Sequence, residues 1–416
     1  MKRIVLLCGC LLVWGSAGAQ LTLDSCRLLA LNLYSYVDKP FTAEASFDFS
    51  KFRDHVGKAM RMMDDIIDLE LEKVGQIIAK IADPEEADIR YVESNLWKKV
   101  REMALKGRRT GLGITAEGDM IAALGMRYGS DKAVAFAVEV QKCLALAAYG
   151  ASVKMAAERG AFPVYDAAKE VNNPMIARIR EADPALYEEM AKVGRRNIAM
   201  LTIAPTGTTS LMSQTTSGIE PVFRTVYKRR RKINPSDVDT HVDYEDETGE
   251  KFQEYNVYHH NFVKWLEASG YDTSKLATIS DAELNEWVAA SPYHGATAND
   301  IDWVAKVKMQ GAIQKWVDHS ISVTVNLPNN VSEALVADVY RTAWECGCKG
   351  VTVYLPRRRA AGEKLQEPEE VRGASRRGAE ASQVDSCRHR AVQERHGGLD
   401  RLRGLAGRAS LRGLHG

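Results

Sequence analysis

Residues 197–210 read NIAMLTIAPTGTTS, and this stretch does most to decide the fold. Its first part, Asn197–Pro205, is apolar and β-rich and stops at a proline, as does SISVTVNLP (320–328). KGVTVY (349–354) is similar in composition. Such runs are typical of strands that are buried on both faces of a parallel sheet. Because helical segments separate them, the sequence predicts an α/β layered or barrel architecture.

A small polar cluster follows the first of these strands. It is uncharged and consists of Thr206, Gly207, Thr208, Thr209 and Ser210. Ligands bind at strand ends in α/β folds, glycine lets the backbone approach them, and successive N–H groups can hold an anion. Two interpretations stay open, a phosphate-binding loop and an ordinary connection in which Thr or Ser caps the next helix. No lysine follows the glycine, which excludes a Walker-type loop.

Three long segments have apolar residues at helical spacing. Residues 47–74 are predicted as a helix with Ser50 as its N-cap, and residues 87–109 as a helix that Gly107 terminates. Residues 130–161 are rich in alanine, and their apolar content predicts a helix buried on most sides, capped by Ser130 or Asp131.

The C-terminal half adds further helices around one charged segment. A helix is expected from about Asn256, and another over 300–318. The charged segment Lys232–Lys251 is expected to be an exposed excursion. The sequence therefore predicts a mainly helical middle region, 21–354, with a few short buried strands.

Composition bounds the function. The chain has 416 residues, which is enough for two or three domains, and it is 45% hydrophobic and 27% charged. A net charge of +1 gives no electrostatic reason to expect nucleic acid or an anionic membrane as a partner. Seven cysteines in so long a chain do not indicate a disulfide framework.

Both ends differ from the middle. Residues 1–20 have the pattern of a secretory signal peptide, with Lys2 and Arg3 before an apolar run and small residues at 17–19. Residues 355–416 are rich in Arg, Gly and Ala and lack Phe, Tyr, Trp, Ile and Met, so they are expected to be disordered. The alternative for this tail, a basic arm that binds nucleic acid, is weakened by the interspersed acidic residues.

Four smaller features each have a plain structural interpretation. Cys143 lies in the Ala-rich helix and is expected in the core rather than as a nucleophile. Tyr227–Lys232, YKRRRK, is expected to be a solvated face, although it could also pair with a phosphate or an acidic neighbour. Cys346–Cys348, CGC, has no second Cys or His pair at zinc spacing. His259 and His260 are expected on a helix surface or in the core rather than as ligands.

Taken together, several segments resemble the large subunits of ribonucleotide reductases. The segments are DSCRLLALNLYSYV, RRTGLGITAEGDMIAALGMRYGS, APTGTTS with SGIEPVF and YKRR, and DHSISVTVNLPNNVSEALVADVYRTAWECGCKGVTVY. The wording of APTGT, GIEP and GCKGVTVY is most similar to the adenosylcobalamin-dependent class. The iron-dependent class is the second choice, because it has a tyrosine pair where this chain has only Tyr354.

The resemblance implies part of a ten-stranded α/β barrel that reduces ribonucleotides to 2′-deoxyribonucleotides. It implies adenosylcobalamin as cofactor, a thiyl radical on a cysteine, and a cysteine pair that thioredoxin or a glutaredoxin-like protein re-reduces. It also allows a homodimer. Carried over to this sequence, Cys26 is a redox cysteine, and the substrate's phosphates bind at Thr206, Gly207, Thr208, Thr209 and Ser210.

The chain departs from the family at both ends. The radical-cysteine position falls on Gly15, and its flanking Asn and Glu positions fall on Val13 and Ala17. After Tyr354 the chain reads LPRRRAAG where the family has a segment like RDGSRSG. Shifted reading frames at both ends of a reductase fragment would explain these departures, so we expect the chain as written to be inactive and its signal-like start to be accidental.

Three functional hypotheses therefore follow from the sequence. The first is a fragment of a cytoplasmic, adenosylcobalamin-dependent ribonucleotide reductase. The second is a non-catalytic remnant that still binds nucleotide phosphates. The third is an exported helical protein, which rests on residues 1–20 alone.

Overall fold

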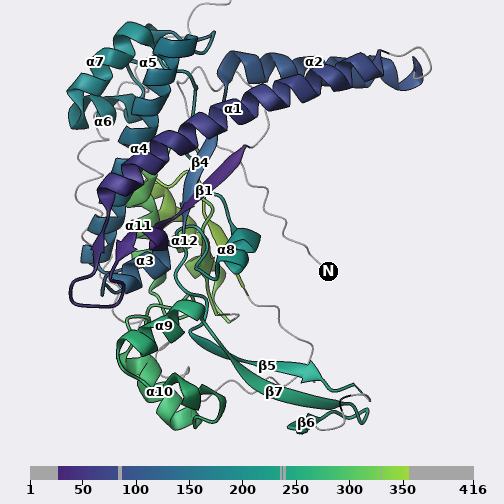
Figure 1. The fold of residues 1–416 in the computed structure, drawn as a ribbon, viewed down its shortest axis with the longest axis vertical. Coiled ribbons are helices and arrows are strands. Elements are labelled where there is room, and N and C mark those ends of the chain that lie inside the picture. The colour runs from purple at the N-terminus through teal and green to yellow at the C-terminus, as the bar shows by residue number, and fades with distance from the viewer. Residues whose placement is uncertain (1–26, 83–86, 235–236, 238–239, 329, 356–416) are drawn as a thin grey trace, which may run out of the picture. The chain divides into compact units, whose positions relative to one another are not determined.

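A series of parallel extended segments organises the molecule (Figure 1). The computed structural model describes residues 27–82, 87–234, 237, 240–328 and 330–355. In it β1 (Leu28–Asn32) pairs in parallel with β4 (Gly111–Thr115), and β8 (Thr324–Asn326) pairs in parallel with β9 (Thr352–Tyr354). Two parallel bridges, Leu112 to Leu201 and Ile203 to Ile321, connect these pairs through the segment 199–203. The prediction of parallel strands is thus confirmed for these described segments. The predicted burial on both faces is wrong for β9, whose Thr352 and Tyr354 are exposed because this strand has β8 on one side only.

The segment 199–203 is less regular than its composition predicted. It pairs as isolated bridges rather than as a continuous strand. The physical reason is Asp318, whose carboxylate accepts the N–H groups of Met200 and Leu201 at 2.9 and 2.6 Å. A side chain thereby satisfies two backbone donors that a neighbouring strand would otherwise have bound.

The long helices begin within two residues of where the sequence placed them, and two of them also end there, whereas the first continues to Ile81 instead of ending at Val74. α1 (Phe49–Ile81) packs beside α2 (Ala87–Gly107) and α4 (Asp131–Arg159). Gly107 ends α2 and Ser130 caps α4, as predicted. Ser50 does not cap α1: the N-cap is Asp48, whose carboxylate accepts the N–H of Lys51 at 2.9 Å. Asp48 is favoured because it directly precedes the first helical residue, so that its side-chain oxygen can reach the N–H groups of the first turn.

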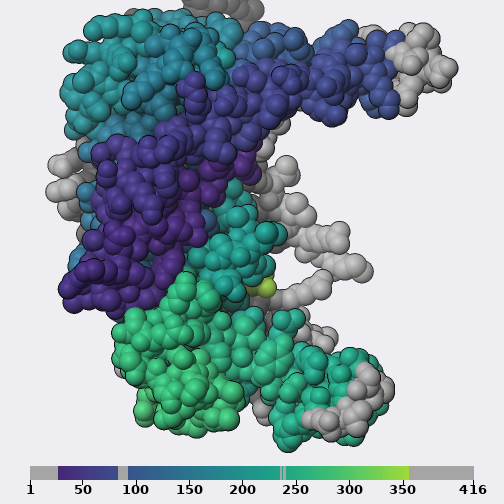
Figure 2. Space-filling view, viewed as in Figure 1, coloured from purple at the N-terminus to yellow at the C-terminus, as the bar shows by residue number. Residues whose placement is uncertain are grey.

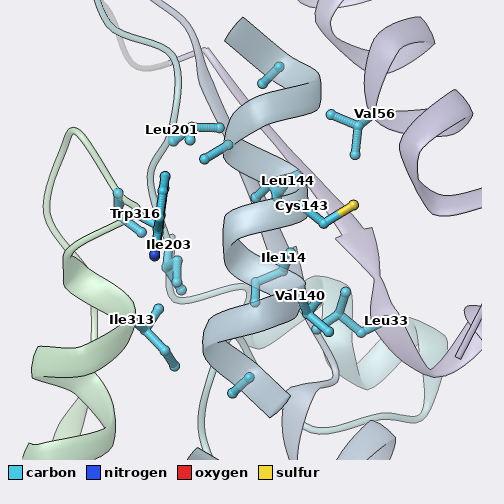
Figure 3. Packing of buried hydrophobic residues seen from close by; sticks show 14 of the residues in the cluster. Leu33, Val56, Ile114, Val140, Cys143, Leu144, Leu201, Ile203, Ile313 and Trp316 are labelled. Carbon is cyan, nitrogen blue, oxygen red and sulfur yellow. The ribbon is translucent and has the colours of Figure 1, made fainter. Parts of the chain in front are cut away.

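The main core is built around α4 (Figure 3). Val140 and Leu144 of α4 lie beside Ile114 of β4, with Ile313 and Trp316 on the other side, and all five are buried. Cys143 is buried on the side of α4 that faces Val56, which confirms it as a core residue. α4 is long and apolar enough to cross a membrane, yet half of its most apolar stretch is buried within the protein, as in the core helix of a folded domain.

Short elements complete the part around α4. The 3-10 helix η2 (Leu33–Tyr36) and the pair β2 (Val37–Asp38) and β3 (Ser46–Phe47) follow β1. α3 (Glu117–Ala123) follows β4, and α8 (Gly207–Ser213) follows the segment 199–203. Between α4 and that segment lie α5 (Ala167–Glu170), α6 (Pro174–Ala182) and α7 (Pro184–Val193). Proline opens both α6 and α7, where its missing N–H costs no hydrogen bond.

An antiparallel sheet and two helices form a second packing unit. β5 (Val226–Lys232) and β6 (Tyr244–Glu245) both pair with β7 (Lys251–Tyr258). The helix expected from Asn256 begins later, because β7 continues to Tyr258 and α9 spans His260–Ala268. The aromatic residues and the one valine of KFQEYNVY suit a strand paired with β5, and this pairing outweighs the helical pattern.

The remaining helices pack over smaller cores. Next come the 3-10 helix η4 (Thr273–Ala277) and α10 (Asp281–Ala290), which join α9 around Phe262, Trp265 and Trp287. α11 (Trp303–Gln314) and α12 (Glu333–Glu345) cover β8 and β9 around Val307 and Val339. The described residues of the segment Lys232–Lys251 are mostly exposed, as expected for an excursion.

Candidate substrate-phosphate site

The predicted phosphate loop turns sharply from the segment 199–203 into α8. Thr206 has a left-handed backbone with φ of 51°, and no side chain caps α8. Gly207, Thr208 and Thr209 are exposed, whereas Ser210 is buried. α8 lies on the molecular surface in Figure 2. The N–H groups of a first helical turn have no partner within the helix, so this loop presents free donors and a partial positive charge to solvent.

Thr206 stands where a helix cap would stand but uses its hydroxyl differently. Its Oγ1 accepts the N–H of Gly218 at 2.9 Å and shares a hydrogen bond of 3.0 Å with Thr115 Oγ1. The interpretation of the loop as an ordinary connection, capped by Thr or Ser, is therefore wrong for Thr206. The hydroxyl fixes the loop to β4 and leaves the first turn of α8 open.

The second polar cluster, 213–218, folds back beside the loop. Ser210 and Ser217 share a hydrogen bond between hydroxyls at 2.6 Å, and Ser213 and Thr215 share one at 2.8 Å. The backbone carbonyl of Thr216 accepts the hydroxyl of Thr115 at 3.2 Å. The two clusters and the end of β4 thus form one network of neutral donors and acceptors.

A buried carboxylate, Asp119 on α3, anchors this network. Its Oδ2 accepts the N–H of Thr216 at 2.7 Å. Its Oδ1 is bonded to His259 Nε2 at 2.7 Å and accepts the hydroxyl of Tyr293 at 2.8 Å. Burial by itself would raise the pKa of Asp119, but the charge of His259 and the hydrogen bonds from His259, Thr216 and Tyr293 outweigh it and leave that pKa below its usual value.

A second anchor lies where the polar cluster ends. Glu220 forms an ion pair with the buried Lys306, and its other oxygen accepts the N–H of Thr324 at 2.7 Å. Lys306 also donates to the carbonyl of Thr324 at 2.5 Å. The segment after the loop is thereby fixed to α11 and β8, and the charge of Glu220 is balanced before it can oppose an anion at the loop.

Glu117, two residues before Asp119, has a contrasting environment. It is fully buried, and neither carboxyl oxygen has a hydrogen-bond partner among the described residues. Burial raises its pKa from 4.5 to about 8. At neutral pH Glu117 therefore carries a proton and adds no negative charge behind the loop.

The other residues singled out in the sequence either lie outside the described residues or lie apart from this network. Cys26 and the Gly15 position lie outside the described residues, as do the predicted leader, 1–20, and all but the first residue of the predicted tail, 355–416. YKRRRK forms most of the exposed strand β5 and pairs with acidic neighbours, for example Lys228 with Asp281 at 3.0 Å.

The histidine pair, His259 and His260, and the cysteine pair, Cys346 and Cys348, belong to no group of metal ligands among the described residues. No group of three or more His, Cys, Asp or Glu residues is placed to hold an ion there. Burial raises the pKa of Cys348 to about 12, so this thiol is a poor nucleophile. His259, expected on a helix surface or in the core, occupies the N-cap position of α9, and its side chain bonds to Asp119 instead of capping the helix.

Sequence reasoning missed Thr115, Asp119 and Tyr293. One signal could have found the first two, because the strand GLGIT (111–115) ends in a threonine and is followed by AEGD (116–119), just as the segment 199–203 is followed by the polar phosphate loop. Two polar clusters at the ends of neighbouring parallel strands meet at one edge of a sheet. Nothing in the local sequence marks Tyr293, which arrives from a turn after α10.

Comparison with known proteins agrees with this arrangement. Residues 18–354 match the family model described as the ribonucleotide reductase barrel domain. The vitamin B12-dependent ribonucleoside-diphosphate reductase of Mycobacterium tuberculosis is 28% identical over 338 residues, which cover 80% of this chain and 39% of that protein. The protein of the same name from Thermoplasma acidophilum is 27% identical, over 80% of this chain and 35% of that protein.

The chain spans less than two fifths of the length of most of these relatives, and 28% of the vitamin B12-dependent ribonucleotide reductase of Rhodopirellula baltica, to which it is 27% identical. The parallel segments with covering helices are the part of the α/β barrel that the sequence predicted. With a family model matched over most of its length, the chain belongs to the ribonucleotide reductase family, through its barrel domain.

Proposed function

We propose that this chain is the part of an adenosylcobalamin-dependent ribonucleotide reductase that binds the phosphates of a ribonucleoside diphosphate. The observation that carries the proposal is the loop Thr206–Ser210, whose exposed first turn is left uncapped in a chain of this family. Its relatives are named vitamin B12-dependent reductases, which supports the cofactor class and the reduction of ribonucleotides to deoxyribonucleotides.

The loop suits a phosphate chemically. Its donors are backbone N–H groups and the hydroxyls of Thr208 and Thr209, none of which is charged or titratable near neutral pH. Neutral donors can hold an anion beside a radical reaction without supplying protons to it. Two carboxyls near the loop do not oppose the anion, because Glu220 is paired with Lys306 and Glu117 is protonated at neutral pH.

The cofactor itself is assigned no residue of this chain. When bound, adenosylcobalamin would supply the radical that starts the reaction. Two small cavities among the described residues, one beside Tyr128 and Tyr293 and one beside Tyr165 and Tyr187, hold only water-sized molecules and do not fit a corrin ring.

The cysteine chemistry is also a proposal. Cys26 would be one of the redox cysteines, re-reduced by thioredoxin or a glutaredoxin-like protein. We propose the cytoplasm as the location of the protein, because its substrate and such reductants would be available there. With glycine at position 15 no thiyl radical can form at the family's position, so we expect the chain as written to bind nucleotide without reducing it.

Binding measurements on the full chain test the proposal. Wild-type protein should bind CDP more tightly than cytidine in isothermal titration calorimetry, because only CDP carries phosphates. Thr208→Glu puts a negative charge in the exposed first turn of α8 and should weaken CDP binding by at least about tenfold. Thr208→Ser, which keeps the hydroxyl, is the matched control and should bind as wild type does. Equal affinity for CDP and cytidine in the wild type would refute the proposal.

A further inference from the structure

We propose that Asp119 is a positioning residue for the phosphate loop, and that it holds the loop in its binding conformation through Thr216. The inference rests on the proposed binding of substrate phosphates at Thr206–Ser210. Asp119 itself is fully buried and lies behind the loop, so it would act on the substrate only through its neighbours.

The link between Asp119 and Thr216 is reciprocal. The Asp119 carboxylate accepts the backbone N–H of Thr216 at 2.7 Å, and the backbone N–H of Asp119 donates to Thr216 Oγ1 at 3.2 Å. A pair of bonds in opposite directions fixes both the distance and the rotation of the two backbones. Because one acceptor is ionised, this is among the stronger kinds of hydrogen bond in the network.

From Thr216 a directed chain of hydrogen bonds reaches the loop. The Thr115 hydroxyl donates its single proton to the carbonyl of Thr216. In the bond of 3.0 Å between the two threonine hydroxyls, Thr206 must then be the donor and Thr115 the acceptor. Gly218 N–H in turn donates to Thr206 Oγ1 at 2.9 Å. Every hydroxyl in the chain therefore has one consistent orientation, and the left-handed Thr206 is held by it.

α3 gives Asp119 a rigid base. All residues of α3 are buried, and two N–H groups at its start donate to carbonyls of the second polar cluster. The N-cap residue Ala116 donates to Thr216 at 3.0 Å, and Glu117 donates to Gly218 at 3.2 Å. A Cβ placed on Gly118 would lie 2.7 Å from the backbone carbonyl of Glu220, so α3 and the segment after the loop are in close contact. The helix cannot shift away from the loop without breaking several of these bonds at once.

The other oxygen of Asp119 joins the loop to a different part of the molecule. His259 begins α9 and Tyr293 follows α10, and Tyr293 is a member of the core around Phe262 and Trp287. Their bonds to Oδ1 orient the carboxylate so that Oδ2 faces Thr216. Loop geometry thus depends on the packing of α9 and α10 as well as on β4.

Asp119→Asn is the direct test, on the full chain. If the amide oxygen stays with His259 and Tyr293, an NH₂ group meets the N–H of Thr216, and the bond is lost. We expect CDP affinity to fall roughly tenfold or more, with cytidine affinity changed less than about twofold. Hydrogen exchange of the peptide covering 206–218 should speed up in the protein without ligand.

Two further comparisons separate positioning from general damage. Thr216→Val removes the acceptor for Asp119 N–H and should behave as Asp119→Asn does, whereas Thr216→Ser keeps that oxygen and should restore CDP affinity. This pair keeps the test decisive if Asp119→Asn does not fold. Glu170→Gln removes another buried carboxylate, bonded to Arg195 at 2.9 Å, and should leave both affinities and the exchange of 206–218 as in wild type.

The outcomes are distinct. Wild-type CDP affinity and unchanged exchange of 206–218 in Thr216→Val would overturn the role of Asp119 while leaving the proposed function in place. A wild type that does not prefer CDP over cytidine would overturn the proposed function, and this inference with it. Faster exchange at 206–218 with equal loss of CDP and cytidine affinity would also count against it, because a positioned phosphate loop must act on the phosphates.

Discussion

Replacing Glu117 with glutamine should make the difference in stability between variant and wild type depend on pH, and this difference should favour the variant more at alkaline pH than at acidic pH. Glu117 is fully buried without a partner among the described residues, and its pKa is raised from 4.5 to about 8. Between these values the unfolded chain ionises Glu117 while the native state keeps it protonated. Unfolding then releases a proton, so Glu117's contribution to stability is present below about pH 4.5 and is lost as pH rises to about 8.

The size of the effect follows from the pKa values. At about 1.4 kcal/mol for each pH unit, the linkage lowers wild-type stability by roughly 1 kcal/mol at pH 5 and by roughly 4 kcal/mol at pH 8. Glu117→Gln cannot ionise, so its stability relative to wild type should grow by roughly 3 kcal/mol between these two pH values. The buried amide lacks partners at both pH values alike, and its cost cancels from this change.

Urea unfolding followed by circular dichroism at pH 5 and pH 8 measures the change. Glu170→Gln is the matched control, because Glu170 is also buried but is paired with Arg195, and its loss should destabilise the protein at both pH values. If the stability of Glu117→Gln relative to wild type is the same at both pH values, Glu117 is ionised in the native state. The reasoning from unpartnered burial would then be refuted.

Two further predictions concern packing and buried charge. Gly113→Ala should destabilise the protein by at least about 3 kcal/mol in urea unfolding, because the new Cβ would lie 2.0 Å from the carbonyl oxygen of Thr202. Gly57→Ala is the control: Gly57 lies within α1, a Cβ there would meet no atom within 4 Å, and the change should stabilise the protein by about 0.5–1 kcal/mol. Asp64→Ala should cost about 3–5 kcal/mol, because the buried carboxylate binds Arg108 at 2.8 Å and Arg196 at 3.2 Å. The exposed pair of Asp54 with Lys58 is its control, and Asp54→Ala should have no measurable effect on unfolding.

The local sequence pattern was enough to predict those helices whose own residues determine where they form and end. Apolar spacing predicted α1, α2 and α4, and glycine and serine at positions 107 and 130 predicted two of their ends. β7 was missed because its pairing with β5, whose paired residues lie twenty or more positions earlier in the chain, decides between strand and helix. The segment 199–203 was predicted as a regular strand, and no local pattern could show that Asp318 would take two of its N–H groups.

The candidate site likewise has one part that the sequence predicted and one part that only the structure shows. The hydroxyl cluster Thr206–Ser210 is contiguous in sequence, so composition and resemblance both pointed to it. His259 lies 140 residues after Asp119 in the sequence and Tyr293 lies 174 residues after it, so only folding brings the three side chains together. The choice between a capped connection and an open phosphate loop also needed the structure, since it depends on the direction of one hydroxyl, that of Thr206.

Polar side chains at the two ends of the parallel segments have different hydrogen-bond partners, and this difference favours ligand binding at the carboxyl end only. At the amino end, Asp318 binds the N–H groups of Met200 and Leu201, and Lys349 donates to the carbonyls of Val317 and Asp318. These charges are satisfied by the chain's own backbone, so they stabilise the fold and offer little to a ligand.

At the carboxyl end the arrangement is reversed. The hydroxyls of Thr115 and Thr206 bond to each other and to the backbone, Glu220 is balanced by Lys306, and the first turn of α8 is left without a side-chain cap. The side chains there thus satisfy one another, and the backbone donors stay open to solvent. An anion that binds at these donors therefore displaces only water and need not break the network that positions them. This is why the phosphate site is expected at Thr206–Ser210 and why its geometry should depend on Asp119 behind it.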